Sequence, residues 1–173
     1  MTKYIVALMV FMMAGCGGLT YQKGSFLRSG KAHQYTNANW GITAVFPYDV
    51  KEVPGMMKNG FMVQSFDKDE TIAYTIAAFI VPDDVLARKG VNGVLDYAVN
   101  SVVIGSNGIL AFNRVIKLHN YPGRHYQVNT RTIIFEDCLY LVDNRMYFVA
   151  VAYKNGAILP ISTELFYSMF DVK

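Results

Sequence analysis

Charged residues are scarce in this sequence of 173 amino acids. Asp, Glu, Lys and Arg together make up 17% of the chain, and the formal net charge is +3. The basic residues form no run, whereas nucleic-acid-binding proteins need a concentrated basic footprint. We therefore expect no nucleic-acid partner.

Long apolar runs are also missing. The apolar segment Tyr4–Met13 has ten residues, too few to cross a hydrocarbon core as a permanent helix, which takes about 20. Lys3 precedes this segment, and Met13-Ala14-Gly15-Cys16 follows it. A positive residue, a short apolar run and small residues before a cysteine are typical of a bacterial lipoprotein signal. The alternatives are an ordinary secretory signal with a chance cysteine and a cytosolic protein with an apolar start.

The lipoprotein interpretation assigns residues 1–15 to a cleaved signal peptide and Cys16 to lipid attachment. The thiol takes a diacylglycerol, and the freed amine takes a further acyl chain such as palmitate. Each buried CH₂ contributes about 0.8 kcal/mol, so two or three chains anchor the protein stably to a membrane. Gly17, rather than Asp, after the cysteine predicts passage to the outer membrane, facing the periplasm, if the cell has two membranes.

Cysteine is scarce as well. With Cys16 lipidated, Cys138 is the only remaining thiol, so no intrachain disulfide is expected. Cys138 lies between Asp137 and Leu139 in a strand pattern, which favours a small buried hydrophobe. A nucleophile and an intermolecular disulfide are the alternatives, and no histidine-containing signature supports the nucleophile.

Motifs for catalysis and ligand binding are missing too. The chain has no Gly-x-Ser-x-Gly, no phosphate-cradling glycine loop and no His-Glu-x-x-His. The acidic segment Asp67–Glu70 lacks the glycine and the distal glutamate of a calcium loop, so a solvated hairpin tip is favoured. We expect no enzyme, no cofactor and no metal site.

One folded domain is expected after a tether. Residues 16–39 are polar and contain Gly and Ser without a sustained period, which is typical of a tether, with room for a short first strand at its end. Residues 40–173 form the domain, since a chain of this length can bury one core and is too short for two. The expected strands are Trp40–Pro47, Phe61–Phe66, Thr71–Val81 and Ile109–His119, and the expected helices are Val91–Ile104 and Ser162–Phe170.

The helix Val91–Ile104 has the clearest periodicity. Its apolar residues recur at i, i+3, i+4 and i+7, and Asn92, Asp96 and Asn100 fall on the opposite side. Asp83-Asp84 is typical of a helix start or a turn, and Gly105–Gly108 predicts the helix end. The expected buried face is Val91, Val94, Leu95, Ala98, Val99, Val102 and Val103.

The stretch Asn120–Tyr153 is the most regular part of the domain. Tyr121-Pro122-Gly123-Arg124 predicts a type II turn, because Pro sets φ and Gly accepts a positive φ. Val142-Asp143-Asn144-Arg145 predicts a two-residue hairpin of type I′, because Asp and Asn tolerate the left-handed region. The first turn would place His119 and His125 on opposite faces of the ribbon, too far apart to share a metal.

Alternation around the second turn gives two apolar faces, so both are expected to be covered, as in a sandwich. Tyr140 and Tyr147 should lie opposite each other. They are either core rings with hydroxyls at the surface or an aromatic patch for a partner or ligand. One face carries Leu139, Leu141, Met146, Phe148 and Ala150, and the other carries Cys138, Tyr140, Val142, Tyr147 and Val149.

Taken together, these segments resemble PsbP-like domains. The similarity rests on Tyr121–Arg124, on Leu139–Tyr147 and on the ending Leu165–Phe170, in the order that the family shows, and it covers residues 40–172. It implies an α+β fold in which an antiparallel β-sheet is flanked by helices, the α/β/α sandwich of the Mog/PsbP group. Members of this family are mostly non-enzymatic accessory or assembly factors, and the family has no catalytic motif to carry over.

Two classes of function fit these patterns. The first is a membrane-anchored, non-catalytic lipoprotein that binds or helps assemble a protein partner in the envelope. The second is a carrier of a small apolar ligand in an aromatic and Met-lined pocket between sheet and helix. The partner and the oligomeric state are left open. Candidate residues of the partner or ligand surface are Tyr121, Arg124, Tyr140, Arg145 and Tyr147.

Overall fold

The computed structural model describes residues 32–54 and 59–173. The predicted signal peptide, Cys16 and most of the predicted tether lie outside the described residues. No helix in the described part of the chain is long and apolar enough to span a membrane. The strands are β1 His33–Asn37, β2 Ile42–Phe46, β3 Val50–Glu52, β4 Gly60–Phe66, β5 Ile72–Ile80, β6 Ile109–Leu118, β7 Tyr121–Asn129, β8 Ile133–Val142, β9 Arg145–Lys154 and β10 Asp171–Val172, and the helices are α2 Asp83–Ser106 and α3 Thr163–Ser168.

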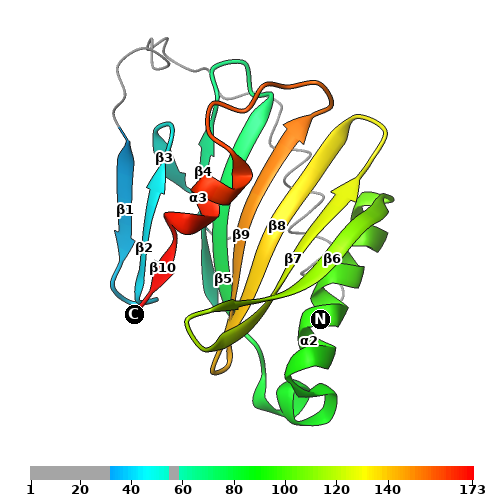
Figure 1. Ribbon diagram of the computed structural model, residues 1–173. Coiled ribbons are helices and arrows are strands. Elements are labelled where there is room, and N and C mark those ends of the chain that lie inside the picture. Colours follow the sequence, from blue (N-terminus) through cyan, green and yellow to red (C-terminus); the bar gives the residue numbers. More distant parts are fainter. Residues whose placement is uncertain (1–31, 55–58) are drawn as a thin grey trace.

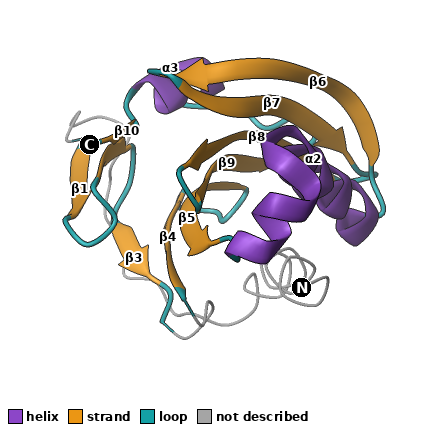
Figure 2. Cartoon of the chain, turned by 90° about the horizontal axis from the view of Figure 1, so that it is seen from below, coloured by secondary structure: helices purple, strands orange, loops and turns teal. Residues whose placement is uncertain are grey.

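The strands form two antiparallel sheets. The large sheet has seven strands in the order β3-β4-β5-β9-β8-β7-β6, and the small sheet has three in the order β1-β2-β10. The small sheet and α3 lie on one side of the large sheet (Figure 1), which curves around α2 on its other side (Figure 2). The predicted α+β class with antiparallel sheet is therefore confirmed.

Both faces of the large sheet are buried. One cluster packs beneath α2 and includes Leu95, Tyr126 and Phe148. The other packs beneath the small sheet and α3 and includes Tyr74 and Phe166. The side chains of the β8–β9 hairpin sort onto these faces as predicted, with Leu139, Leu141, Met146 and Phe148 toward α2 and Cys138, Tyr140, Val142, Tyr147 and Val149 toward α3.

The hairpin between β8 and β9 turns at the predicted place. Val142 pairs with Arg145, which leaves Asp143 and Asn144 as a two-residue turn. The predicted type I′ geometry is wrong, because that turn needs a positive φ at both central residues. Only Asp143, with φ of 55°, has one. The side chain of Asn144 instead donates from Nδ2 to Oδ1 of Asp83, at 3.2 Å.

The predicted turn at Tyr121–Arg124 is wrong. Leu118 pairs with Tyr121, so the chain reverses at His119 and Asn120, and the segment from Tyr121 onward is strand β7. His119 takes the positive φ, 53°, that the turn needs. Pro122 is tolerated because it lies near the end of the strand, before the β7–β8 pairing begins at Gly123.

The helix α2 is longer than predicted. It begins at Asp83, where two acidic residues occupy its first turn, and it ends at Ser106 with Asn107 as a left-handed cap. Gly90, with φ of 67°, interrupts it and separates a short first part from the predicted one. Val91, placed on the buried face by the sequence pattern, is 39% exposed because it directly follows this kink.

Several of the remaining elements follow the sequence pattern, whereas the short strands β3 and β10 were not predicted. The strands β4 and β5 form the predicted hairpin, and the carboxylate of Asp67 holds its loop by accepting from the backbone N–H of Thr71 and Ile72 at 2.6 and 2.8 Å. Strand β1 lies within the predicted tether and pairs with β2. Ser162 caps α3 by accepting from the N–H of Leu165, at 3.2 Å. Leu165 itself is 49% exposed.

Candidate functional site

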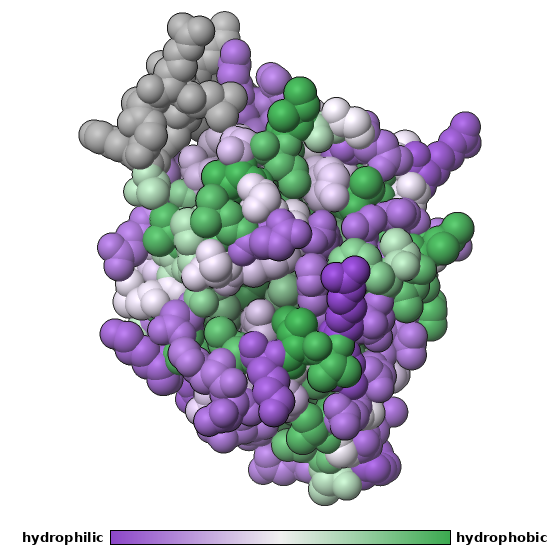
Figure 3. Space-filling model, viewed as in Figure 1, coloured by the Kyte–Doolittle hydropathy of each residue, from purple (hydrophilic) through white to green (hydrophobic). Residues whose placement is uncertain are grey.

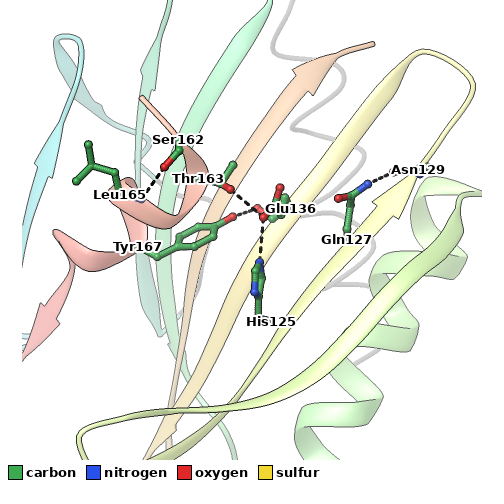
Figure 4. Close-up of polar contacts among 8 residues, drawn as sticks. All are labelled: His125, Gln127, Asn129, Glu136, Ser162, Thr163, Leu165 and Tyr167. Atoms are coloured by element: carbon green, nitrogen blue, oxygen red, sulfur yellow. Dashed lines mark hydrogen bonds and ion pairs between the residues drawn. The ribbon is translucent and has the colours of Figure 1, made fainter. Parts of the chain in front are cut away.

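A buried polar cluster joins α3 to the large sheet. The carboxylate of Glu136, on β8, accepts from Oγ1 of Thr163 at 2.8 Å and lies 3.0 Å from Nε2 of His125. The hydroxyl of Tyr167 donates to the backbone carbonyl of Glu136. Figure 4 shows Thr163, Tyr167 and His125 converging on Glu136. The cluster therefore spans β7, β8 and α3.

The geometry of this cluster suits a structural clamp. Glu136 is the shared acceptor, so His125 and Thr163 both point at the carboxylate rather than at each other. Nucleophilic catalysis needs a base within reach of a hydroxyl or thiol. Here Nε2 of His125, the ring nitrogen that faces the cluster, contacts the carboxylate of Glu136 instead. Glu136 is 8% exposed, which makes it a poorly solvated anchor for the start of α3.

The adjacent acid points the other way. Asp137 lies on the α2 side of β8, opposite Tyr126 of β7 in the register, and is 4% exposed. Burial raises the pKa of Asp137 to about 7. Tyr126 opposes that rise, the charge of Glu136 adds to it, and His125 opposes it more weakly. Burial also raises the pKa of Tyr126 well above its ordinary value. This pair was not singled out from the sequence, because no spacing pattern marks an acid that pairs across strands.

Cys138 is buried, as predicted. Its side chain is 3% exposed in the core beneath α3, and burial raises the pKa of its thiol to about 12. A thiol held in the protonated form is a poor nucleophile, since the thiolate is the reactive species. Its chemical inertness stays a prediction.

Arg124 ties the helix α2 to strand β7. Its Nε donates to Oδ1 of Asp96 at 2.8 Å, and its Nη2 donates to Oδ1 of Asn92 at 3.1 Å. The arginine side chain is 7% exposed and the aspartate 51%. Asn92 and Asp96 are exposed, as predicted, and Arg124 reaches them from the sheet at the edge of the helix. Arg124 is thus a packing element of the fold and not part of an exposed surface.

The other predicted surface residues divide into buried and accessible ones. Tyr140 and Tyr147 lie opposite each other, as predicted, and are 6% and 1% exposed. The ring of Tyr140 stacks on Phe170, and the hydroxyl of Tyr147 donates to the backbone carbonyl of Trp40 at 2.9 Å. Both rings therefore belong to the core, which was the first of the two predicted alternatives, and they form no exposed aromatic patch.

Arg145 and Tyr121 remain accessible at the turn ends of their strands. Arg145 is exposed, and its guanidinium lies over the ring of Trp40, 5.3 Å from the centroid. Tyr121 is half-buried at the start of β7. The structure does not bring these two residues together with the three buried ones into one surface.

The two histidines of this region lie apart. His119, in the β6–β7 turn, has its Nε2 2.7 Å from Oδ1 of Asp171, whereas His125 belongs to the Glu136 cluster. A turn at Pro122-Gly123 would have placed Asn120 opposite His125. That register was wrong, because His125 pairs with Arg114. Among residues 32–54 and 59–173, no group of three or more potential ligands converges on a metal site.

The space between α2 and the sheet is nearly filled. A cavity of about 10 Å³ lies there, lined by apolar residues of both layers and by Lys89 and Tyr97. This volume corresponds to about one water molecule. A carrier function for a small apolar ligand finds no support in this cavity.

The edge of the large sheet at β6 is apolar and accessible. Every residue of this strand is exposed or half-buried, whereas β7 and β8 both contain buried residues. Ile109 and Val115 are 76% and 74% exposed, and Leu110 is 37% exposed. Ile104, at the end of α2, is 77% exposed. The sequence pattern predicted a strand here but gave no sign that it lies at an edge, because edge position depends on the strand order.

Comparisons with known proteins add little. No protein-family model matches the chain, and no curated protein matches it. A solved structure from Bacteroides thetaiotaomicron is similar at 10% sequence identity, with a TM-score of 0.42 over 81% of this chain and 48% of that chain. The chain thus spans about half the length of that protein. A similarity at this level carries no argument about fold or function.

Proposed function

We propose that this protein is a lipid-anchored lipoprotein of the cell envelope whose single domain binds or helps assemble a protein partner without catalysis. Removal of residues 1–15 leaves Cys16 as the lipidated N-terminus. In a cell with two membranes, the protein faces the periplasm from the outer membrane. The finer fold assignment is part of the proposal: α2 on one face of the sheet and α3 with the small sheet on the other form a PsbP-like sandwich.

The exposed apolar side chains at the junction of α2 and β6 carry this proposal. Ile104, Ile109 and Leu110 are close in sequence and are 77%, 76% and 37% exposed. Figure 3 shows hydrophobic atoms at the right-hand side of the molecule, where α2 ends and β6 begins in the same view as Figure 1. Clustered exposed apolar residues mark interaction surfaces more often than isolated ones do.

The use of the ionisable groups supports binding over catalysis. Glu136 and Arg124, the two buried groups with the best-formed polar contacts, hold α3 and α2 against the sheet. A group engaged in this way stabilises the scaffold that presents a surface. The proposal therefore places function on the exposed edge and not in the core.

Lipid attachment is tested by Cys16→Ser in the full chain, expressed in cells fed with labelled palmitate. The parent chain should incorporate the label and shift to the mature size. The variant should do neither, because the serine hydroxyl cannot take the diacylglycerol. Incorporation of label into the variant would contradict the anchor.

Partner binding is tested by placing a photoreactive residue at Ile109 or at Ile158 in the native envelope. Ile158 is a matched control, because it is an isoleucine that is 92% exposed and lies in the loop between β9 and α3. A discrete crosslinked protein should appear from position 109 only and should be lost when Ile104→Lys is added. Equal capture from both positions would show that the junction is not a binding surface.

A further inference from the structure

The second half of β6 has a free backbone edge. In the part of the chain that the structure describes, β6 is the last strand of the large sheet and only β7 pairs with it. Leu118 and Tyr121 close a two-residue turn, and such a closing pair exchanges its backbone hydrogen bonds. Because these bonds alternate along an antiparallel pair, Asn113, Val115 and Lys117 direct their N–H and C=O groups away from β7.

We propose that this edge pairs with β6 of a second copy of the protein, antiparallel, about a twofold axis at Val115. In this register Val115 faces Val115 of the second copy, and Asn113 faces Lys117. All three residues present outward backbone groups, so the pairing forms a continuous hydrogen-bonded ladder on both sides of the axis. A twofold interface requires a surface that complements itself, and this strand does so.

The side chains of β6 favour this register. Arg114 lies opposite Ile116 of the second copy, and Lys117 lies opposite Asn113, so no two cations face each other. If the twofold axis lay at Arg114 instead, Arg114 would face Arg114 of the second copy, which is destabilising. If the axis lay at Ile116, one hydrogen-bonded pair would be lost, because the ladder would then run into the β6–β7 turn.

A second copy also explains the exposed valine. Val115 is 74% exposed in the part of β6 that pairs regularly with β7, from Phe112 to Leu118, and at the twofold axis it would pack against its own equivalent. On the other face, Phe112 would lie opposite Leu118, and the guanidinium of Arg114 already covers the Phe112 ring at 4.8 Å from its centroid. Strand β10 of the small sheet lies beside the β6–β7 turn, where Nε2 of His119 is 2.7 Å from Oδ1 of Asp171, whereas Asn113, Val115 and Lys117 are exposed. This inference depends on neither the lipid anchor nor the partner proposed above.

Cysteine crosslinking in the full chain tests the register. Cα atoms of a hydrogen-bonded antiparallel pair are about 5.5 Å apart, within the range that a disulfide spans. Val115→Cys should therefore give a disulfide-linked dimer under mild oxidation in the native envelope. Asn113→Cys is the matched control on the same edge. Because Asn113 faces Lys117 in this register, position 113 of one copy would lie four residues, or about 13 Å, along the strand from position 113 of the other. The parent chain controls for Cys16 and Cys138.

A second pair of variants makes the outcome specific. Asn113→Cys combined with Lys117→Cys should crosslink as efficiently as Val115→Cys, since these positions face each other across the axis. Adding Val115→Pro to this double variant should reduce the crosslink at least tenfold, because proline removes the outward N–H while leaving the β6–β7 ladder intact. If Val115→Cys and Asn113→Cys crosslink equally, the register is wrong. If the crosslinked product is a different protein, such as one offering an acidic strand, the second copy is not the occupant.

Discussion

Thr163 and Glu136 are joined by a hydrogen bond of 2.8 Å across the buried boundary between α3 and the large sheet. The helix α3 has only six residues, and helices this short are unstable without tertiary contacts. Its position therefore depends on a small number of polar and aromatic contacts to β8. This dependence makes the helix sensitive to changes in the sheet beneath it.

Thr163→Val should lower the free energy of unfolding by about 1–3 kcal/mol. The change keeps the shape of the side chain and removes the hydroxyl that donates to the buried carboxylate of Glu136. Fewer hydrogen bonds then compensate for the desolvation of that carboxylate. Urea unfolding of the mature chain with Cys16→Ser measures the effect. Thr132→Val is the control, because Thr132 is exposed in the β7–β8 loop, and it should change stability by less than about 0.5 kcal/mol.

Asp137 should make the protein less stable as the pH rises from 4 to 7. Burial raises the pKa of Asp137 from 3.8 to about 7. Between these values the folded protein keeps a proton that the unfolded chain has lost, so stability falls with rising pH and stays low above pH 7. The shift of about three pKa units corresponds to about 4 kcal/mol.

Asp137→Asn should remove this dependence, since the amide stays neutral throughout. The parent and the variant should have similar free energies of unfolding at pH 4, and the variant should be the more stable at pH 8. Urea unfolding at four pH values between 4 and 8 measures both. Parallel curves for the two proteins would contradict the assignment.

Gly123→Ala should destabilise the domain by about 1–3 kcal/mol, through overpacking. A Cβ atom at this position would overlap the carbonyl oxygen of Leu139 and lie 2.7 Å from Cδ1 of Tyr140. The cause is contact with the neighbouring strand, because Gly123 does not have a positive φ. Gly93→Ala is the matched glycine control: its nearest neighbour is Cβ of Lys89 at 3.4 Å, and it should stabilise α2 by about 0.5–1 kcal/mol.

The two central residues of the β8–β9 turn should respond to glycine in opposite ways. Asp143→Gly should stabilise the domain by about 0.5 kcal/mol, because it relieves a left-handed backbone. Asn144→Gly should destabilise it by about 0.5–1 kcal/mol, since it adds backbone freedom to the unfolded chain and removes the side-chain hydrogen bond to Asp83. Thermal unfolding of both variants gives the order, and the reverse order would contradict the turn geometry.

The sequence predicted those elements whose signals are local. The β8–β9 hairpin was predicted because apolar residues alternate on both strands and Asp143-Asn144 suits a turn. The segment Tyr121–Arg124 was assigned wrongly because Pro122-Gly123 matches a turn more strongly than His119-Asn120 does. The pairing of β7 with β8 decided the outcome: Gly123 lies against Leu139 and Tyr140, where no larger residue fits. Glycine is therefore required at position 123 by close packing against the neighbouring strand and not by a positive φ.

The polar cluster could not be predicted from local signals. His125, Glu136 and Thr163 come from two strands and a helix that are distant in sequence, and their convergence depends on how α3 docks. The burial of Tyr140 and Tyr147 likewise depends on the small sheet and the chain end above them. Which strand forms the exposed edge follows from the strand order, and hydrophobic periodicity does not contain that order.

The central pairing of β5 with β9 has a consequence for the order of folding. It joins Ile72–Ile80 to Arg145–Lys154, whereas β6, β7, β8 and β9 are consecutive and are connected by short turns. Local pairings form faster than distant ones, because closing a long loop costs more chain entropy. The four-stranded meander is thus expected to form early, with β5 added across the α2 segment in the slow step. Until then the inner edge of β9 is open, and this is the interval in which the chain is most exposed to aggregation.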